Sequence, residues 1–163
     1  MGMVEVQIDG LAMDLVSNSP VVVLASKELN KVLPIWIGHS EAWAIAMELS
    51  GLGSKRPLTH DLFKTAIMEM GGRLDKVEIT ELKEQTFYAR LYLSADGNNI
   101  DIDARPSDSI ALALKSKCPI YVNEELFTLK PDDTPEEMRP SDPESLADRL
   151  KRIDPEDFGK YSL

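Results

Sequence analysis

An acidic segment near the middle of the chain gathers residue types that could do chemistry. Residues 100–108 read Ile-Asp-Ile-Asp-Ala-Arg-Pro-Ser-Asp. Their apolar–polar alternation predicts a half-buried strand, and the proline cannot continue its hydrogen-bond ladder. Ser107 is a good N-cap residue, so a helix is expected to follow. Asp103, Arg105 and Asp108 would then surround one strand-to-helix corner.

A second corner has the same order of residue types. Residues 56–61 read Arg-Pro-Leu-Thr-His-Asp, with Thr59 the expected N-cap of another helix. An arginine such as Arg56 beside free helix N–H groups can bind a phosphate. His60 is a histidine that could act as a general acid or base and move a proton, although a surface histidine at the first helical position needs no function.

Each of these features also has a plain structural explanation. Asp61 and Asp108, near helix N-termini, would stabilise the helix dipoles by about 0.3–1 kcal/mol each. Asp103 could be a solvated counter-charge for Arg90, and Arg105 could form a structural ion pair with Asp103 or Asp108. The functional alternative for the same carboxylates is a divalent-cation site, which requires their oxygens to converge on one point.

The sequence contains no standard catalytic motif. Walker, Gly-x-Gly-x-x-Gly, Gly-x-Ser-x-Gly and His-Glu-x-x-His patterns are absent, so we expect no organic cofactor. One cysteine and two histidines cannot fill a usual structural zinc site. Cys118 precedes a proline and is typical of a small packing residue. As the single cysteine it also fits a reducing cytoplasm, which is the location we predict.

The overall composition is that of a globular domain with an acidic appendage. The 163 residues are 43 % hydrophobic, and no apolar run approaches the roughly 20 residues of a membrane helix. The net charge of −10 opposes simple electrostatic binding of nucleic acid. That charge is uneven, because residues 123–163 carry 12 acids and 6 bases. We predict one domain over residues 1–127 and an acidic, proline-rich extension over residues 128–163 with one short helix, Glu144 to Arg152.

Hydrophobic periodicity predicts an α+β fold with a mixed, largely antiparallel sheet and helices packed against it. Strands are expected at residues 4–15, 21–25, 32–37, 73–82, 86–94, 100–104 and 120–122, the first with a bulge at Asp9-Gly10. The helix Glu41–Leu49 is almost wholly apolar, which indicates burial in the domain or against a second subunit. A second helix starts near Thr59 and has an apolar face. A third runs from Asp108 to before Pro119.

The pair Asp96-Gly97 predicts a type I′ hairpin between the two strands that flank it. A two-residue turn would place Arg90 opposite Asp103. A four-residue turn would keep the same faces but set Arg90 opposite Arg105, and like charges directly opposite each other are unfavourable. We therefore predict the two-residue register.

Several stretches of the chain resemble the bifunctional nuclease family. They are Leu33-Pro34-Ile35-Trp36-Ile37-Gly38, Arg56-Pro57-Leu58-Thr59-His60-Asp61, Thr86-Phe87-Tyr88-Ala89, Ile102-Asp103-Ala104-Arg105-Pro106-Ser107-Asp108 and Pro119-Ile120-Tyr121-Val122. The resemblance covers roughly residues 3–127. It implies an α+β fold, an oligomeric and often dimeric assembly, and cleavage of RNA and DNA, for which plant members are named. The motif residues that could be catalytic are His60, Asp61, Arg105 and Asp108.

The leading hypothesis is a phosphodiesterase that acts on nucleic acid with a divalent cation, Mg²⁺ or Mn²⁺. In this hypothesis Asp61, Asp103 and Asp108 hold the metal, and His60 moves a proton. Arg56 and Arg105 neutralise the scissile phosphate.

The alternative hypothesis is a non-catalytic, oligomeric binding module. The helix Glu41–Leu49 would then form a subunit interface, and the acidic extension would recruit a partner. The two hypotheses differ in one geometric expectation. A nuclease with a single site requires the Arg56–Asp61 and Asp103–Asp108 corners to converge.

Overall fold

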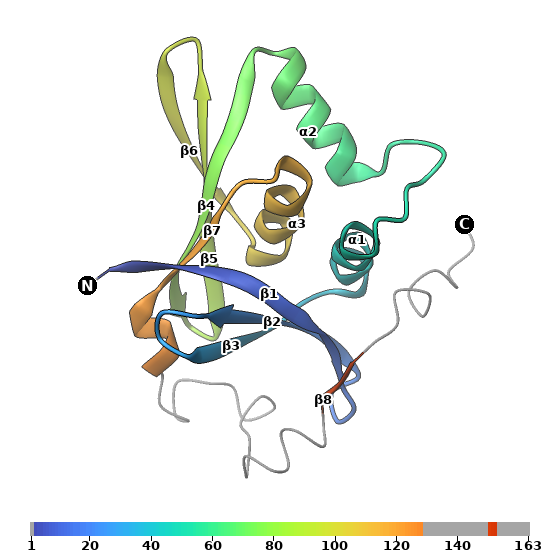
Figure 1. Cartoon of the computed structure of the whole chain (residues 1–163), viewed down its shortest axis with the longest axis vertical. Coiled ribbons are helices and arrows are strands. Elements are labelled where there is room, and N and C mark those ends of the chain that lie inside the picture. The colour runs from blue at the N-terminus through green and yellow to red at the C-terminus, as the bar shows by residue number, and fades with distance from the viewer. Residues whose placement is uncertain (1, 129–149, 153–163) are drawn as a thin grey trace.

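The computed structural model of the protein describes residues 2–128 and 150–152 (Figure 1). In chain order the elements are β1 (Met3–Asp14), β2 (Ser19–Ser26), β3 (Lys31–Trp36), α1 (His39–Ser50), α2 (Thr59–Glu69), β4 (Gly72–Lys83), β5 (Thr86–Ala95), β6 (Asn98–Ala104), α3 (Pro106–Ser116), β7 (Ile120–Asn123), the 3₁₀ helix η1 (Glu124–Thr128) and β8 (Leu150–Arg152). The order of strands and helices agrees with the predicted order, and the structure adds η1 and β8.

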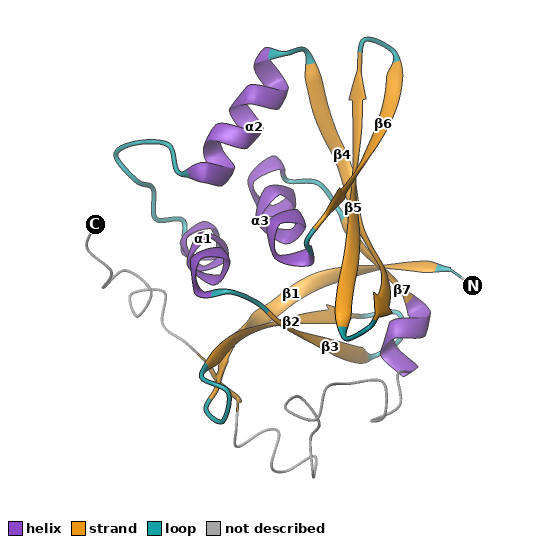
Figure 2. Ribbon diagram, turned by 180° about the vertical axis from the view of Figure 1, so that it is seen from behind, coloured by secondary structure: helices purple, strands orange, loops and turns teal. Residues whose placement is uncertain are grey.

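The strands form one sheet in the order β3-β2-β1-β7-β4-β5-β6. Only the β4–β7 pair is parallel among the described strands, so the predicted mixed, largely antiparallel α+β fold is confirmed. Figures 1 and 2 show that the β1–β3 arm and the β4–β6 arm run in different directions. The three α-helices lie in the angle between these arms.

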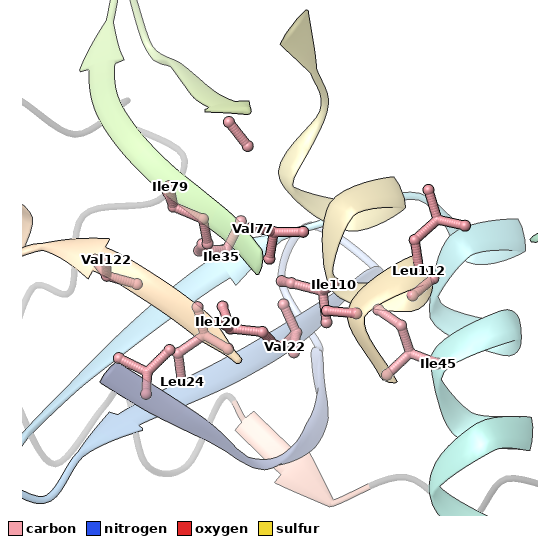
Figure 3. Close-up of a cluster of buried hydrophobic side chains, with 14 of the residues drawn as sticks. Val22, Leu24, Ile35, Ile45, Val77, Ile79, Ile110, Leu112, Ile120 and Val122 are labelled. Atoms are coloured by element: carbon pink, nitrogen blue, oxygen red, sulfur yellow. The ribbon is translucent and has the colours of Figure 1, made fainter. Parts of the chain in front are cut away.

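The hydrophobic core fills the space between the sheet and two of the helices (Figure 3). Leu24 and Ile35 from the first arm and Ile79 from the second are almost fully buried. Ile45 from α1 and Ile110 from α3 meet them in one cluster. Helices α1 and α3 are therefore fixed by apolar packing.

Local sequence signals predicted the strand details well. The register of β1 against β2 shifts between Ile8 and Gly10, as the bulge prediction required. Arg90 lies opposite Asp103 in the β5–β6 hairpin, which confirms the two-residue register. The guanidinium nevertheless donates from Nε to the diagonal neighbour, Asp101, over 2.7 Å.

The predicted N-caps were wrong by one or two residues. Thr59 lies inside α2, whose N-cap is Leu58, and Ser107 lies inside α3, whose N-cap is Arg105. In α2 the Asp61 carboxylate accepts the Leu58 N–H over 2.9 Å, which is the bond that the acidic residue of a capping box makes. In α3 a proline occupies the first turn, where its missing N–H leaves nothing unsatisfied.

Helix α1 is buried within its own chain. Ala42, Ala44, Ile45 and Ala46 are almost inaccessible. This outcome matches the first of the two alternatives for the helix, burial in the domain. A second subunit is not needed to cover these four side chains.

Helix α2 differs, because no residue in it is buried. Its predicted apolar face is turned outward, with Leu62 62 % exposed, and Met70, directly after the helix, 82 % exposed. Ile67 alone among the predicted apolar residues of this helix packs against the core. Apolar burial therefore does little to hold α2 in place.

The predicted helix Glu144 to Arg152 lies mostly outside the described residues. Its last three residues, Leu150–Arg152, instead form strand β8, which pairs antiparallel with Ala12–Asp14 of β1. Within β1, only Met3–Val6 pair with β7. The rest of that edge of β1 is thus available for another strand. Pairing with β8 there satisfies backbone N–H and C=O groups of β1, which a helix cannot do.

None of the described helices has the length and apolar character needed to span a membrane.

The β5–β6 turn generates a stability prediction. Replacing Gly97 by alanine should lower the free energy of unfolding by about 1 kcal/mol, because its φ of 77° is disfavoured for residues with a Cβ. Urea denaturation measures the change. The control Gly53→Ala has open space around its Cβ and should change stability by no more than about 0.5 kcal/mol. Equal losses in the two variants would contradict the role of the turn.

Candidate active site

The two predicted corners meet at the N-terminal ends of α2 and α3. The Nε2 atom of His60 lies 2.9 Å from Oδ1 of Asp108. The two residues are 48 positions apart in the chain, so only the packing of α2 beside α3 brings them together. The convergence that a single site requires is therefore present for these two residues.

Arg105 extends this pair into a chain of charges. Its Nε donates to Oδ2 of Asp108 over 2.8 Å, and its Nη2 donates to Oε1 of Glu41 over 2.6 Å. The Arg105 side chain is 64 % exposed, whereas Glu41 is largely buried. Two carboxylates thus fix the guanidinium, and the rest of the guanidinium remains open to solvent.

The Glu41 carboxylate lies against the glycine at the N-cap of α1. A Cβ built at Gly38 would collide with Oε2 of Glu41. The glycine has an ordinary φ of −75°, so the backbone conformation does not require glycine here. Its lack of a side chain leaves room for the Glu41 carboxylate. Gly38 therefore allows Glu41 to lie where Arg105 can reach it.

The contacts within this cluster fix its charges. Burial alone would raise the pKa of Asp108, but hydrogen bonds from Arg105 and His60 outweigh burial, and the pKa falls below its ordinary value. The pKa of Arg105 is raised by its hydrogen bonds to Asp108 and Glu41. Near neutral pH the cluster therefore contains an ionised Asp108 beside a permanent cation.

A second ionic bridge runs parallel to the first. The Nζ atom of Lys115 lies 2.6 Å from Oδ1 of Asp61 and 3.1 Å from Oε2 of Glu48. The Lys115 side chain is only 7 % exposed. The bridge joins α1 through Glu48, α2 through Asp61 and α3 through Lys115.

Sequence reasoning missed Glu41, Glu48 and Lys115 as members of this site. The sequence does hold a signal for them. Glu41 and Glu48 are seven residues apart in α1, and Asp108 and Lys115 are seven apart in α3. Residues seven apart share one helical face, so these spacings could have indicated two facing ladders of charge.

The second bridge also sets the state of Asp61. Its pKa is lowered, mainly by the hydrogen bond from Lys115 and further by the Leu58 N–H, against the opposing effect of burial. Burial would lower the pKa of Lys115, but Asp61 and Glu48 together raise it. Both oxygens of Asp61 are thus engaged in holding α2 to its neighbours.

Helix α2 is held mainly by polar contacts on the side that faces α3. Besides His60 and Asp61, Lys64 donates from Nζ to the Lys115 carbonyl oxygen over 2.9 Å. Because α2 buries no residue, these bonds determine where His60 lies. The position of the imidazole therefore depends on ionic and hydrogen bonds more than on the core.

Two predicted site residues are not part of the cluster. Asp103 lies on β6 opposite Arg90, and Arg56 lies in the exposed loop before α2. Within residues 2–128 and 150–152, no group of three His, Cys, Asp or Glu side chains is placed to hold a metal ion. The predicted ligands Asp61, Asp103 and Asp108 therefore do not converge, because cations already engage Asp61 and Asp108 and Asp103 belongs to the hairpin.

Cys118 and His39 have structural surroundings and lie outside the cluster. Burial raises the pKa of the Cys118 thiol to about 11, so the thiolate is scarce at neutral pH. His39 lies with Nε2 3.2 Å from the Asn18 carbonyl oxygen, outside the cluster. His60 is thus the histidine of the described chain that contacts a carboxylate.

Comparison with known proteins points in one direction. The family model of the bifunctional nuclease domain matches residues 22–135. An uncharacterised protein of Mycobacterium tuberculosis is 42 % identical over 162 residues, which cover 94 % of this chain and 97 % of that protein.

Plant relatives carry the nuclease name. Bifunctional nuclease 1 of Oryza sativa subsp. indica is 32 % identical over 76 % of this chain and 39 % of its own length. Bifunctional nuclease 1 of Arabidopsis thaliana is 29 % identical over 66 % of this chain and 34 % of its own length. The chain therefore spans less than two-fifths of these plant proteins.

The buried lysine generates a prediction for stability and its pH dependence. Lys115→Met should lower the free energy of unfolding at pH 7 by about 1–3 kcal/mol, because it leaves Asp61 and Glu48 without their shared cation. The pKa of Asp61 is lowered in the folded state, so its stabilisation is present above pH 4 and is lost as the pH falls through that lowered value.

Urea unfolding of the parent and the variant at pH 7 and at about pH 3 measures both effects. The difference between the two proteins should shrink at the lower pH. The surface variant Lys27→Met is the control and should change stability by no more than about 0.5 kcal/mol. A difference for Lys115→Met that is the same at both pH values would contradict the bridge.

Proposed function

The chain belongs to the bifunctional nuclease domain family, and on that basis we propose that it is a nuclease whose active site is the His60–Asp108–Arg105 cluster. The observation that carries the proposal is the 2.9 Å contact between His60 and Asp108 beside an exposed arginine. The substrate would be RNA, DNA or both.

His60 is suited to move the proton of the attacking water. If Nε2–H donates to Asp108, the imidazole keeps the lone pair of Nδ1 for an incoming proton. The ionised Asp108 orients the ring and stabilises the imidazolium that forms. This division of labour needs the carboxylate to stay charged, which its lowered pKa ensures.

Arg105 is suited to bind the scissile phosphate. Its Nε donates to Asp108 and its Nη2 donates to Glu41. The guanidinium is exposed and has further N–H donors that can bind a phosphate. The oxygen of water would attack phosphorus while the bond to the leaving oxygen breaks. The proton taken by His60 then returns to that leaving oxygen, and Arg105 balances the charge that develops on the phosphoryl oxygens.

We assign no step to a metal ion. The carboxylates of Asp61 and Asp108 are already neutralised by Lys115 and Arg105, and Asp103 lies in another group of contacts. The residues present therefore do not fit the predicted three-carboxylate site. Assays with Mg²⁺, with Mn²⁺ and with EDTA are still separate arms, because a cation could be recruited with the substrate phosphate.

A non-catalytic, oligomeric binding module is the second candidate function. It is favoured by the exposed apolar side chains of α2, among them Leu62 and Phe63. Apolar side chains gathered on one exposed helix are a common mark of interaction surfaces. A protein that forms a stable oligomer but cleaves none of the four substrates below would support this candidate over the nuclease.

Cleavage assays on single- and double-stranded RNA and DNA test the proposed function. We expect His60→Ala and Asp108→Asn each to reduce the rate at least about 100-fold, because each removes the general base or its orienting charge. His39→Ala is the matched control and should retain the parent rate. Activity that survives in a His60→Ala/Asp108→Ala double variant would assign the cleavage to a contaminating nuclease.

Gly38→Ala tests how Arg105 is positioned. The added methyl group should displace Glu41 from Arg105 and lower kcat/KM by about fivefold, while the free energy of unfolding changes by no more than about 1 kcal/mol. Gly53→Ala, where a Cβ meets open space, should leave kcat/KM unchanged. An unchanged kcat/KM in Gly38→Ala would show that Glu41 does not position the arginine.

A further inference from the structure

Two grooves meet near the C-terminal ends of α2 and α3. The first has a volume of about 780 Å³ and lies between the end of α2, the end of α3 and the start of β4. The second has a volume of about 520 Å³ and lies where β5 ends and β4, β6 and β7 begin. Asp75 and Pro119 line both grooves, so the two grooves meet at these residues.

The first groove is cationic although the chain is strongly acidic. Lys64, Arg73 and Lys117 line it, and its one acidic lining residue, Asp75, accepts a hydrogen bond from Nε of Arg73 over 2.8 Å. The Arg73 side chain is exposed, so its Nη groups are left to bind a ligand. In a chain with a net charge of −10, this is a local excess of positive charge. Such an excess favours a polyanion over the acidic surroundings.

The cationic groove leads directly from the candidate active site. Lys64 lies four residues after His60 in α2, which corresponds to a rise of about 6 Å along the same helical face. Both residues contact α3, His60 at its first turn and Lys64 at its last. Lys64 therefore lies between the candidate active site and this groove along α2.

The second groove presents aromatic rings. Lys76 lies opposite Tyr92 in the β4–β5 pair, so both side chains lie on the same face of the sheet. Its Nζ lies over both rings, 4.7 Å from the centroid of Tyr92 and 5.7 Å from that of Tyr121, so a base would stack on the opposite face of each ring. Both rings line the groove and are only partly buried.

The charges of the second groove select bases over phosphates. Lys76 is already paired with Glu78 over 2.7 Å, and Asp101 also lines the groove. These carboxylates would repel a phosphate, whereas an uncharged base can stack on a tyrosine ring. The backbone of a bound polynucleotide would therefore follow the lysines and arginine of the first groove.

We propose that the two grooves together bind single-stranded nucleic acid, with phosphates on Lys64, Arg73 and Lys117 and bases on Tyr92 and Tyr121. This inference rests on the proposed nuclease function and specifies its substrate class. Bases that stack on protein rings must be unstacked from their neighbours, which a duplex does not permit without opening. The geometry thus favours binding of single strands. Every base has a face that can stack on a tyrosine ring, so no sequence preference is expected.

Binding of labelled 12-nucleotide oligomers tests the aromatic part. Fluorescence anisotropy with oligothymidylate, oligouridylate and a DNA duplex of the same length gives the three affinities. We expect the single strands to bind at least about tenfold more tightly than the duplex, and Tyr92→Leu and Tyr121→Leu each to lose about tenfold. Tyr92→Phe should retain the parent affinity, because the ring is kept.

Tyr88→Leu is the matched control. Tyr88 lies on the same face of the sheet but lines neither groove, so its loss should leave the affinity unchanged. Circular dichroism of each variant verifies folding. Equal binding of duplex and single strand, or an equal effect of all three tyrosine-to-leucine changes, would overturn the proposal.

The salt dependence of the same binding tests the cationic part. The double variant Arg73→Gln/Lys117→Gln should reduce the slope of log affinity against log salt concentration by about 1.4, which is two phosphate contacts on a single strand. The surface pair Lys27→Gln/Lys31→Gln should leave the slope unchanged. An unchanged slope in the groove variant would remove the phosphate contacts from the proposal.

These results separate the groove from the catalytic cluster. Tyrosine-dependent binding without any cleavage would keep the groove and contradict the nuclease. Cleavage that depends on His60, with a KM for long oligomers that is indifferent to Tyr92 and Tyr121, would keep the nuclease and contradict the groove.

Discussion

The buried ammonium group of Lys115 is the interaction on which the candidate site depends. A charge with so little exposure is costly unless it is paired, and its two partners come from different helices, Glu48 from α1 and Asp61 from α2. Because α2 buries no residue of its own, this bridge largely sets its distance from α3. The contact between His60 and Asp108 follows from that placement.

The two ionic bridges share a logic of spacing. Two glutamates seven residues apart on α1 face α3, which carries an aspartate and a lysine seven apart, and the histidine and aspartate of α2 contact that aspartate and that lysine. One bridge is enclosed and structural, and the other ends in an exposed arginine. The same packing of α1, α2 and α3 thus produces a buried bridge that holds the helices together and an exposed cluster that is the candidate active site.

Much of the sheet and part of the site could be predicted from sequence. Alternation in β1 and turn residues at Asp96-Gly97 act locally, so the bulge and the hairpin register were accessible. The convergence of His60 and Asp108 was a requirement of the single-site nuclease hypothesis, and the packing of α2 beside α3 meets it. The partners of Lys115 and the outward face of α2 depend on which distant segments pack together. A seven-residue spacing marks one helical face but does not say which helix lies opposite it.

The lack of buried side chains in α2 has a consequence for how the molecule can open. Elements tied by few apolar contacts exchange with an open form at a lower free energy than the core. Helices α1 and α3 are anchored in the core, whereas α2 can detach by breaking a handful of polar bonds. Formation of the His60–Asp108 contact and global unfolding are therefore separate equilibria. The contact can be regulated without a change in the stability of the core.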